Sequence, residues 1–218
     1  MTWADLAPLL WQATNESAYM VGVSTALTAV GGLLLGVLLV LTGRGGLLAA
    51  RPVHLVLGLI VNVGRSLPFI ILLVAIIPFT RALVGTTIGT TAAIVPLTVG
   101  AIPFFARIVE TAIREVDRDV IAAARAMGAS RTGIVVKVLL REARPGLVAG
   151  LTITVIALVG YSAMAGVVGG GGLGDLAIRY GYQRFENTVM VVTVVLLVVF
   201  VQLIQTLGDL VVRWLSHK

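Results

Sequence analysis

Long apolar runs separated by short polar segments dominate the chain and predict a bundle of membrane-spanning helices. A helix rises about 1.5 Å per residue, so about 20 apolar residues cross the hydrocarbon layer. Runs of this length occupy residues 18–41, 55–79, 88–109, 146–168 and 187–212. We therefore expect an all-α integral membrane protein with five spans in one domain, 1–218, and with its termini on opposite sides.

The residues before the first run have a helical pattern of their own. Within residues 2–17 the apolar positions recur at i, i+3, i+4, i+7 and i+8, as Trp3, Leu6, Ala7, Leu10 and Trp11. An amphipathic helix anchored by tryptophans is typical of a segment that lies in the membrane interface. The alternative is a frayed N-terminus.

Polar and charged residues interrupt the second run. Asn62, Arg65 and Pro68 stand inside residues 55–79. A charge at that depth normally faces a bundle interior or a water-filled cavity, which makes Arg65 a candidate for a functional site. The alternative is that the span begins near Arg65, whose guanidinium group then reaches the headgroups.

Glycines and prolines within the runs carry information about helix packing. Gly32 and Gly36 are four residues apart in the first run, a spacing that allows another helix to approach closely. Pro96 and Pro103 lie in the third run. Prolines there kink a spanning helix and free carbonyl groups that neighbouring helices must satisfy.

The segment 110–145 is a charged region between apolar runs. It has helical spacing on both sides of Gly128, which predicts a helix, a turn and a second helix. Such a unit attached to membrane spans suggests a docking element. At its start, acidic and basic residues alternate at helical spacings, which predicts a solvated ion-paired face: Arg107, Glu110, Arg114, Glu115, Asp117, Arg118 and Asp119.

Composition supports the membrane assignment. Of the 218 residues, 58% are hydrophobic and only 12% are charged. The mean hydropathy of +1.06 means that this chain cannot keep so much apolar surface in water. The first basic residue is Arg44, after the first apolar run, so the basic start of a cleavable signal peptide is missing.

The distribution of basic residues predicts the orientation. With the N-terminus outside, only Arg81, Arg179 and Arg184 fall on the outer side. The other basic residues then lie at or near the cytoplasmic face: Arg44, Arg51, Arg65, Arg107, Arg114, Arg118, Arg125, Arg131, Lys137, Arg141, Arg144, Arg213 and Lys218. Because cytoplasmic loops attract Lys and Arg, this asymmetry explains the net charge of +6 without a nucleic-acid partner.

The sequence offers little catalytic chemistry. It has no cysteine, its histidines His54 and His217 are far apart, and no acidic cluster lies within a span. Neither a catalytic residue nor a metal or cofactor site is therefore expected. A Walker A motif is also missing, so the chain cannot itself drive ATP-dependent movement.

A glycine run at residues 169–174, GGGGLG, matches the dinucleotide pattern G-x-G-x-x-G. We reject that function because the run follows a membrane span and no βαβ unit surrounds it. The glycines favour a flexible or closely packed re-entrant turn at the outer end of the fourth span, suited to a gate. A simple loop is the alternative.

Two sets of sequence strings resemble a known family. IAAARAMGASRTGIVVKVLLREARPGL, from residue 121, resembles the EAA loop of binding-protein-dependent ABC importer permeases. Residues 62–89 and 158–182, together with the closing LIQTLGD, resemble the methionine importer permeases in particular. The chain departs from the family pattern in two places. Ala122 stands where the loop usually has glutamate, and Leu140, Arg141, Glu142 and Ala143 stand where the loop usually ends L-P-E-A. The resemblance covers essentially the whole chain.

The resemblance implies the permease subunit of an ABC importer with the type I fold, located in the cytoplasmic (inner) membrane as a homodimer. The implied partners are two ATPase subunits, which hold ATP and magnesium, and an extracytoplasmic substrate-binding protein. The chain itself is then not an enzyme. Contact with the ATPase is implied for Ile121, Ala122, Ala123, Ala124, Arg125, Ala126, Met127, Gly128, Ala129 and Ser130.

Transport is expected to proceed by alternating access, with methionine as substrate and the choice between its L and D forms left open. Candidate pathway or gate residues are Arg65, Pro68, Tyr161, Ser162 and Met164. Flexible thioether and amphipathic side chains suit an apolar thioether substrate, although they also suit ordinary packing. The alternatives are a permease for another amino acid or a small osmolyte, a channel or structural subunit, and a membrane-embedded enzyme.

Overall fold

The computed structural model describes residues 3–216, and every regular element in that range is a helix. Thr2 of the expected interfacial helix, His217 and Lys218 lie outside the described residues. The four long helices are α1 (Trp3–Thr42), α5 (Thr90–Arg114), α9 (Arg144–Val167) and α11 (Asn187–Ser216). The shorter helices are α2 (Arg51–Ser66), α3 (Phe69–Ala75), α4 (Ile77–Val84), α6 (Arg118–Ala126), α7 (Arg131–Gly133), α8 (Leu140–Glu142) and α10 (Gly172–Leu176), and the π-helical segments are η1 (Ile134–Leu139) and η2 (Ala177–Tyr182).

The four long helices are each long and apolar enough to cross a membrane. A fifth span results if the bent pair formed by α2 and α3 is counted as one. These helices coincide with the five predicted runs. Apart from the start of α1, their ends differ from the predicted ones by a few residues, and α11 extends the last run to Ser216.

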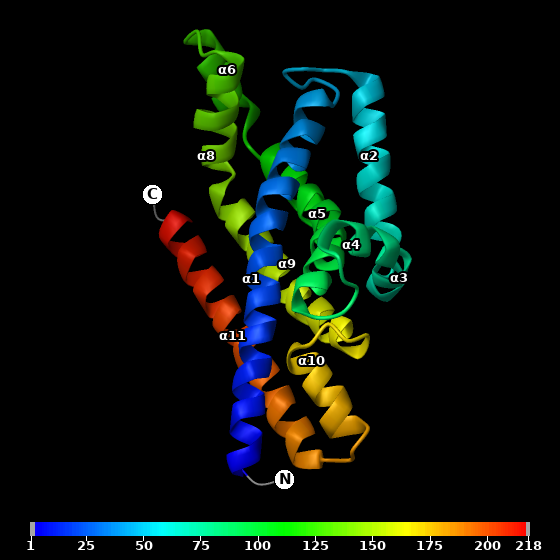
Figure 1. Cartoon of the computed structure of the whole chain (residues 1–218). Coiled ribbons are helices and arrows are strands. Elements are labelled where there is room, and N and C mark those ends of the chain that lie inside the picture. The colour runs from blue at the N-terminus through cyan, green and yellow to red at the C-terminus, as the bar shows by residue number, and fades with distance from the viewer. Residues whose placement is uncertain (1–2, 217–218) are drawn as a thin grey trace.

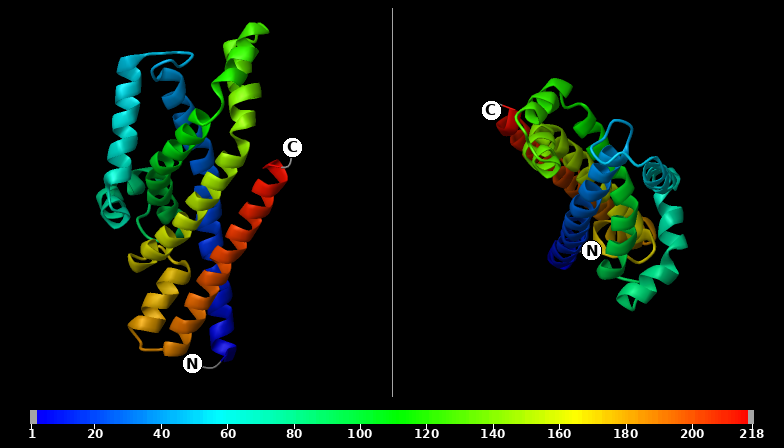
Figure 2. Two further views of the ribbon diagram at one scale, coloured as in Figure 1. Left: turned by 180° about the vertical axis from the view of Figure 1, so that it is seen from behind. Right: turned by 90° about the horizontal axis from the view of Figure 1, so that it is seen from above.

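Helix α5 lies at the centre of the bundle, with α1 along one side and α9 on the other (Figures 1 and 2). In its most apolar stretch 67% of the residues are buried, against 11% for α11. The α6 end of the molecule lies opposite the N-terminal end of α1 (Figure 1). Much of the surface of the outer helices is apolar and exposed, as a membrane-embedded protein requires.

Glycines of α1 allow its close contact with α5, as the spacing of Gly32 and Gly36 predicts. A Cβ atom on Gly36 would lie 2.6 Å from the carbonyl oxygen of Ala106 and 2.6 Å from Cβ of Val109. A Cβ atom on Gly32 would lie 2.8 Å from Cδ1 of Phe105. The two backbones therefore pack at a distance that only glycine permits.

The N-terminal part of α1 is not a separate helix. Residues 3–17 continue without a break into the first span, and the structure corrects the expected break after residue 17. The reason is tertiary packing. Leu6 and Ala13 are buried in a cluster with Leu173, Leu176 and Val189, so this part of α1 has an apolar partner in α10 and α11.

The second run is not one straight span. Helices α2 and α3 meet at a bend of 106°, with Leu67 and Pro68 between them. Leu67 has φ −82° and ψ 125°, and Pro68 caps α3. A following proline favours this extended conformation. The predicted span over residues 55–79 is therefore divided into two helices, because the chain turns where Pro68 interrupts the run.

Pro96 and Pro103 lie inside α5, which remains one continuous helix. The ring of Pro103 packs against α2, because a Cβ atom on Gly64 would lie 2.6 Å from its Cγ. Because Gly64 of α2 has no side chain, there is room for the Pro103 ring.

We predict that Gly36→Ala destabilises the protein, because the new methyl group meets the backbone oxygen of Ala106, which cannot move aside easily. Overpacking of this kind costs about 1–3 kcal/mol. The measurement is the thermal unfolding midpoint in detergent, which should fall. Gly22→Ala is the matched control on the same helix, since a Cβ atom placed there has nothing within 4 Å. Equal midpoints for the two variants would contradict the close contact.

Candidate coupling surface, cavities and family

The charged segment after α5 forms a helix, a turn and a second helix at one end of the molecule (Figure 1). Asp117 caps α6 by accepting a hydrogen bond from the Asp119 N–H at 2.9 Å. Gly128 follows the end of α6 and has φ +78°, a backbone conformation that favours glycine. Ser130 then caps α7 by accepting from the Gly133 N–H at 3.1 Å. The predicted helix–turn–helix is confirmed, and a side-chain cap marks the start of each of its two helices.

One side of α6 is packed and the other is free. Ala124 is 5% exposed, and Ile121 packs against the same buried cluster, which also contains Ile134 and Leu139. Met127 is 82% exposed. Of the ten residues expected to contact an ATPase, the exposed ones are Ala122, Ala123, Arg125, Ala126, Met127, Gly128, Ala129 and Ser130. They form a small, mostly uncharged surface that is available to a partner.

The same buried cluster connects α6 to the spans. It includes Phe105, Val109 and Ile113 of α5, and Leu33 and Val37 of α1 pack against it. Apolar side chains in such a cluster are close-packed and transmit displacement. A force applied to α6 therefore reaches α5 and α1 through direct contacts.

A buried carboxylate lies near the C-terminal end of α5. Glu110 is 3% exposed, with its carboxylate oxygens 2.5 Å from Nη1 of Arg107 and 2.6 Å from Nη2 of Arg114. Arg107 also donates to Oδ1 of Asn62 on α2 at 2.6 Å. The expected solvated ion-paired face is therefore wrong at Glu110, because the packing of neighbouring helices covers this residue and its charge is balanced by two arginines.

A cavity of about 230 Å³ brings two of the candidate pathway residues together. Arg65 and Tyr161 both line it, as do Gly100 and Phe104. The Tyr161 ring stacks on Phe69, with centroids 4.5 Å apart and planes at 7°. Arg65 is exposed to this cavity and lies at the end of α2, just before the bend.

The other three candidate pathway residues lie elsewhere. Pro68 is the N-cap residue of α3 and does not line the cavity. Ser162 is buried, and its hydroxyl donates to the Val159 carbonyl at 2.8 Å, which is a helix-internal contact. Met164 lies on α9, is 39% exposed and does not line the cavity. Within one chain, these three therefore do not form a single site with Arg65 and Tyr161.

The glycine run forms a closely packed turn that leads into α10. Gly174 is buried, and a Cβ atom there would lie 2.3 Å from the carbonyl oxygen of Ala163. Gly171 and Gly172 have φ of +78° and +77°. Of the two alternatives, a packed re-entrant turn fits these contacts and a simple loop does not.

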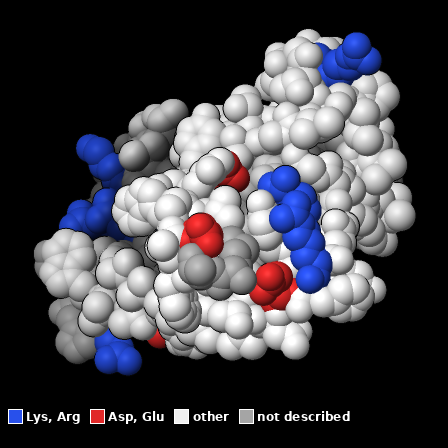
Figure 3. All heavy atoms as spheres, turned by 60° about the horizontal axis from the view of Figure 1, so that its bottom comes forward, with Lys and Arg blue, Asp and Glu red and all other residues white. Residues whose placement is uncertain are grey.

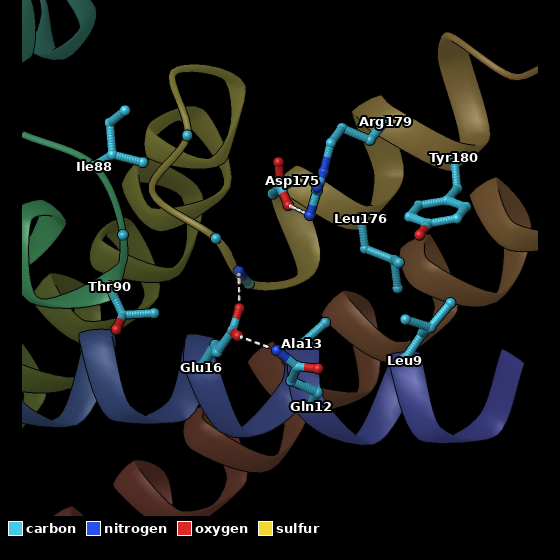
Figure 4. Close-up of a pocket in the computed structure, with 14 residues that line it drawn as sticks. Leu9, Gln12, Ala13, Glu16, Ile88, Thr90, Asp175, Leu176, Arg179 and Tyr180 are labelled. Carbon is cyan, nitrogen blue, oxygen red and sulfur yellow. Dashed lines mark hydrogen bonds and ion pairs between the residues drawn. The ribbon is translucent and has the colours of Figure 1, made fainter.

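A cavity of about 500 Å³ lies between this turn and the N-terminal part of α1 (Figure 4). The Glu16 carboxylate closes one side of it, accepting hydrogen bonds from the Gly172 N–H at 2.7 Å and from Nε2 of Gln12 at 2.8 Å. The Ser17 hydroxyl accepts from the Leu173 N–H at 2.9 Å. Glu16 and Ser17 thus hold the first turn of α10, whose N–H groups have no partner within the short helix itself.

Asp175 and Arg179 form an ion pair on the opposite wall of this cavity (Figure 4). Asp175 is mostly covered, while the Arg179 side chain is 61% exposed. Figure 3 shows that charged groups at this end of the molecule are scattered over a largely uncharged surface. The cavity beside Glu16 therefore presents both signs of charge beside apolar side chains.

Sequence patterns did not indicate Glu16, Ser17 or Phe69 as site residues. Glu16 is four residues after Gln12, a spacing compatible with their observed hydrogen bond. The partner of Glu16 in the glycine turn is 156 residues away, and no local pattern identifies it.

We predict that Glu110→Gln lowers stability, since the amide no longer balances the charges of Arg107 and Arg114. Hydrogen bonds to charged groups contribute about 1.5–3 kcal/mol, and a loss of about 2 kcal/mol is expected. Chemical unfolding in detergent measures this loss in the free energy of unfolding.

The control for Glu110→Gln is Glu115→Gln, which changes an exposed acid at the same helix end. Surface substitutions of this kind usually change stability by less than about 0.5 kcal/mol. An equal loss in both variants would contradict a special role for the buried carboxylate.

Curated proteins similar to the chain are methionine transport permeases by name. It is 54% identical over 210 residues to the probable D-methionine transport system permease protein MetI of Vibrio cholerae, covering 96% of this chain and 93% of the relative. It is 46% identical over 209 residues to the methionine import system permease protein MetP of Bacillus subtilis, covering 96% and 94%.

Solved structures show the same architecture. A chain of the MetNI methionine ABC transporter, in an inward-facing conformation, has a TM-score of 0.96 at 52% identity, with 99% of each chain covered. A chain of an amino acid ABC transporter solved with histidines has a TM-score of 0.78 at 20% identity, covering 96% of this chain and 95% of the other, and supports the fold alone.

A family profile matches most of the chain. The profile describes the binding-protein-dependent transport system inner membrane component, and it matches residues 32–218. The match includes the α6 turn, the glycine turn and all spans except the first part of α1. The chain therefore belongs to the family of binding-protein-dependent transport system inner membrane components.

Proposed function

We propose that this chain is the permease subunit of an ATP-driven importer of methionine. The observation that carries the proposal is its near-complete correspondence with a chain of the MetNI methionine ABC transporter, with a TM-score of 0.96 and 52% identity over 99% of both chains. The names of the similar curated permeases agree with this substrate. ATP and magnesium belong to a separate ATPase subunit, so this chain performs no chemistry itself.

The proposed topology has five spans, with α2 and α3 together forming the second. The N-terminus lies outside the inner membrane and the C-terminus lies in the cytoplasm. The distribution of basic residues supports this orientation, because it places the arginines around α6 on the cytoplasmic side. The glycine turn and the cavity beside Glu16 then face outward.

The proposed assembly contains two copies of this chain, two ATPase subunits and an extracytoplasmic substrate-binding protein. In it, residues 121–130 at the tip of α6 contact the ATPase. Exposed Met127 and Ala126 suit a helix-in-groove contact, where an apolar face enters a groove of the partner. Ala122, also exposed, replaces the usual glutamate of the loop, so this contact depends on shape and apolar burial more than on a salt bridge at that position.

Alternating access follows from the contacts of α6. ATP-driven movement of the partner displaces α6, and the buried cluster that includes Ala124 and Val109 passes the displacement to α5. The Arg107–Asn62 hydrogen bond passes it on to α2, which ends beside the Arg65 cavity. The spans thus move as packed bodies rather than as independent helices.

The proposed pathway runs beside the bend between α2 and α3. Arg65 and Tyr161 line it within one chain, and Pro68 sets the bend. Met164 is exposed on α9 and would meet the pathway or the second copy, while Ser162 supports the helix from inside. The glycine turn acts as the outer gate.

We predict that Met127→Glu weakens association with the ATPase subunit, because a carboxylate enters an apolar contact without a partner. Loss of one buried large side chain and burial of the charge should reduce binding about tenfold or more. Co-purification of the ATPase with the tagged permease measures it. Deleting residues 121–133 should abolish co-purification.

Phe185→Glu is the matched control, since Phe185 is 84% exposed and precedes α11 at the opposite end of the molecule from α6 (Figure 1). This substitution also replaces an exposed apolar side chain with a carboxylate, and it should leave co-purification of the ATPase intact. The restoring change Ala122→Glu should retain or improve association. Full ATPase retention by the deletion variant would refute the coupling role of α6.

Uptake of labelled methionine into vesicles tests the substrate. We expect ATP-dependent uptake when the permease, the ATPase and the cognate binding protein are all present, and no uptake without ATP. Unlabelled L- and D-methionine, another amino acid and a small osmolyte serve as competitors. Failure of methionine to compete, with competition by another amino acid, would favour the alternative substrate class.

A further inference from the structure

Arginines surround a cavity of about 230 Å³ at the α6 end of the molecule. The cavity lies between the loop after α1, the end of α5, α6 and η1, which meet at this end (Figures 1 and 2). Four arginines line it, and we call it the arginine cavity: Arg44, Arg114, Arg118 and Arg125.

The positive charge of the arginine cavity is largely unbalanced. Arg114 pairs with Glu110, but among the described residues no Asp or Glu lines the cavity. Within residues 3–216, the side chains of Arg44, Arg118 and Arg125 make no hydrogen bond or ion pair. Like charges brought to one cavity repel each other unless an anion binds between them.

The rest of the lining is apolar. Val40, Leu41 and Ile113 contribute from the spans, and Ile121 and Leu139 from the charged segment. A free inorganic anion gains no favourable contact from an apolar surface, whereas a phospholipid presents a phosphate group next to hydrocarbon. The cavity therefore has the amphipathic lining that a lipid requires.

An adjoining cavity of about 310 Å³ has the same character. It shares Gly43 and Arg44 with the arginine cavity and adds Arg51 and His54. Its described lining also contains no acidic residue. Arg44 thus stands between two cavities whose described linings lack a protein anion.

We infer that the arginine cavity binds the phosphate group of an anionic phospholipid from the cytoplasmic leaflet. Guanidinium groups bind phosphate oxygens in pairs of hydrogen bonds, and basic pockets beside spanning helices are suited to anionic headgroups. A zwitterionic lipid is disfavoured because its ammonium group finds no carboxylate in the described lining. The choice of leaflet rests on the orientation under the proposed function.

The bound lipid connects two parts of the chain. Arg44 belongs to the loop after α1, whereas Arg118 and Arg125 belong to α6. A phosphate held by both supports α6 against the spans, at the point where an ATPase would push on it. The site shares Ile121 and Arg125 with the segment proposed to contact the ATPase, whereas Met127 at the exposed tip does not line the cavity.

Native mass spectrometry of the purified complex tests the inference. The complex is titrated with phosphatidylglycerol and, separately, with phosphatidylcholine of the same acyl chains. We expect phosphatidylglycerol to be retained preferentially. The double variant Arg44→Gln, Arg118→Gln should bind it roughly tenfold more weakly or worse, since two of the guanidinium groups that attract the phosphate are lost.

Two further variants make the result specific. Arg141→Gln removes an exposed charge of the same segment that does not line the cavity, and it should retain wild-type binding. The double variant Arg44→Lys, Arg118→Lys keeps the charge and should retain most of the binding. The thermal unfolding midpoint of each variant shows that it is folded.

Several outcomes would overturn the inference. One is equal retention of both lipids, and another is unchanged phosphatidylglycerol binding in the Arg→Gln double variant. Displacement of lipid by millimolar inorganic phosphate, without lipid preference, would assign a free-anion site instead. If lipid bound to the permease alone but not to its complex with the ATPase, the arginine cavity would instead be a contact site for an acidic surface of the ATPase. None of these outcomes depends on methionine uptake, so the inference and the proposed function fail separately.

Discussion

Helices α1 and α5 can pack with their backbones nearly in contact because glycines of α1 present no side chain toward α5. A methyl group at Gly36 would already collide with the carbonyl oxygen of Ala106. In a membrane, where apolar burial between helices is weakly favourable, such close van der Waals packing is a main source of association. This contact fixes the position of α5, the most buried of the long helices. The other helices are arranged around the pair.

Both functional ends of the molecule depend on α1. Its N-terminal part provides Glu16 and Ser17, which hold the glycine turn through the N–H groups of Gly172 and Leu173. Its C-terminal end leads into the loop with Arg44, beside α6. One continuous helix therefore contacts the proposed outer gate and the coupling segment, and its contact with α5 connects the two mechanically.

The α6 tip combines stiffness with an unoccupied surface. Asp117 caps the start of α6, Ser130 caps the start of α7, and buried Ala124 anchors α6 to the cluster beneath it. Met127, in contrast, is 82% exposed. A rigid element with one free apolar side chain suits the transfer of movement between subunits, since flexing would absorb the displacement. Ala122 is exposed and takes no part in the buried cluster.

The amino-acid sequence by itself determined the features that depend on neighbours along the chain. Hydrophobicity determined where the membrane helices lie, Gly128 ended the first helix of the charged segment, and Gly32 and Gly36 marked a contact face. Tertiary structure decided the rest. It joined residues 3–17 to the first span, bent the second run at Pro68, buried Glu110, and paired Glu16 with Gly172 across 156 residues. The physical reason is that burial and long-range hydrogen bonds depend on which helix faces meet, and this is set by the packing of the whole bundle.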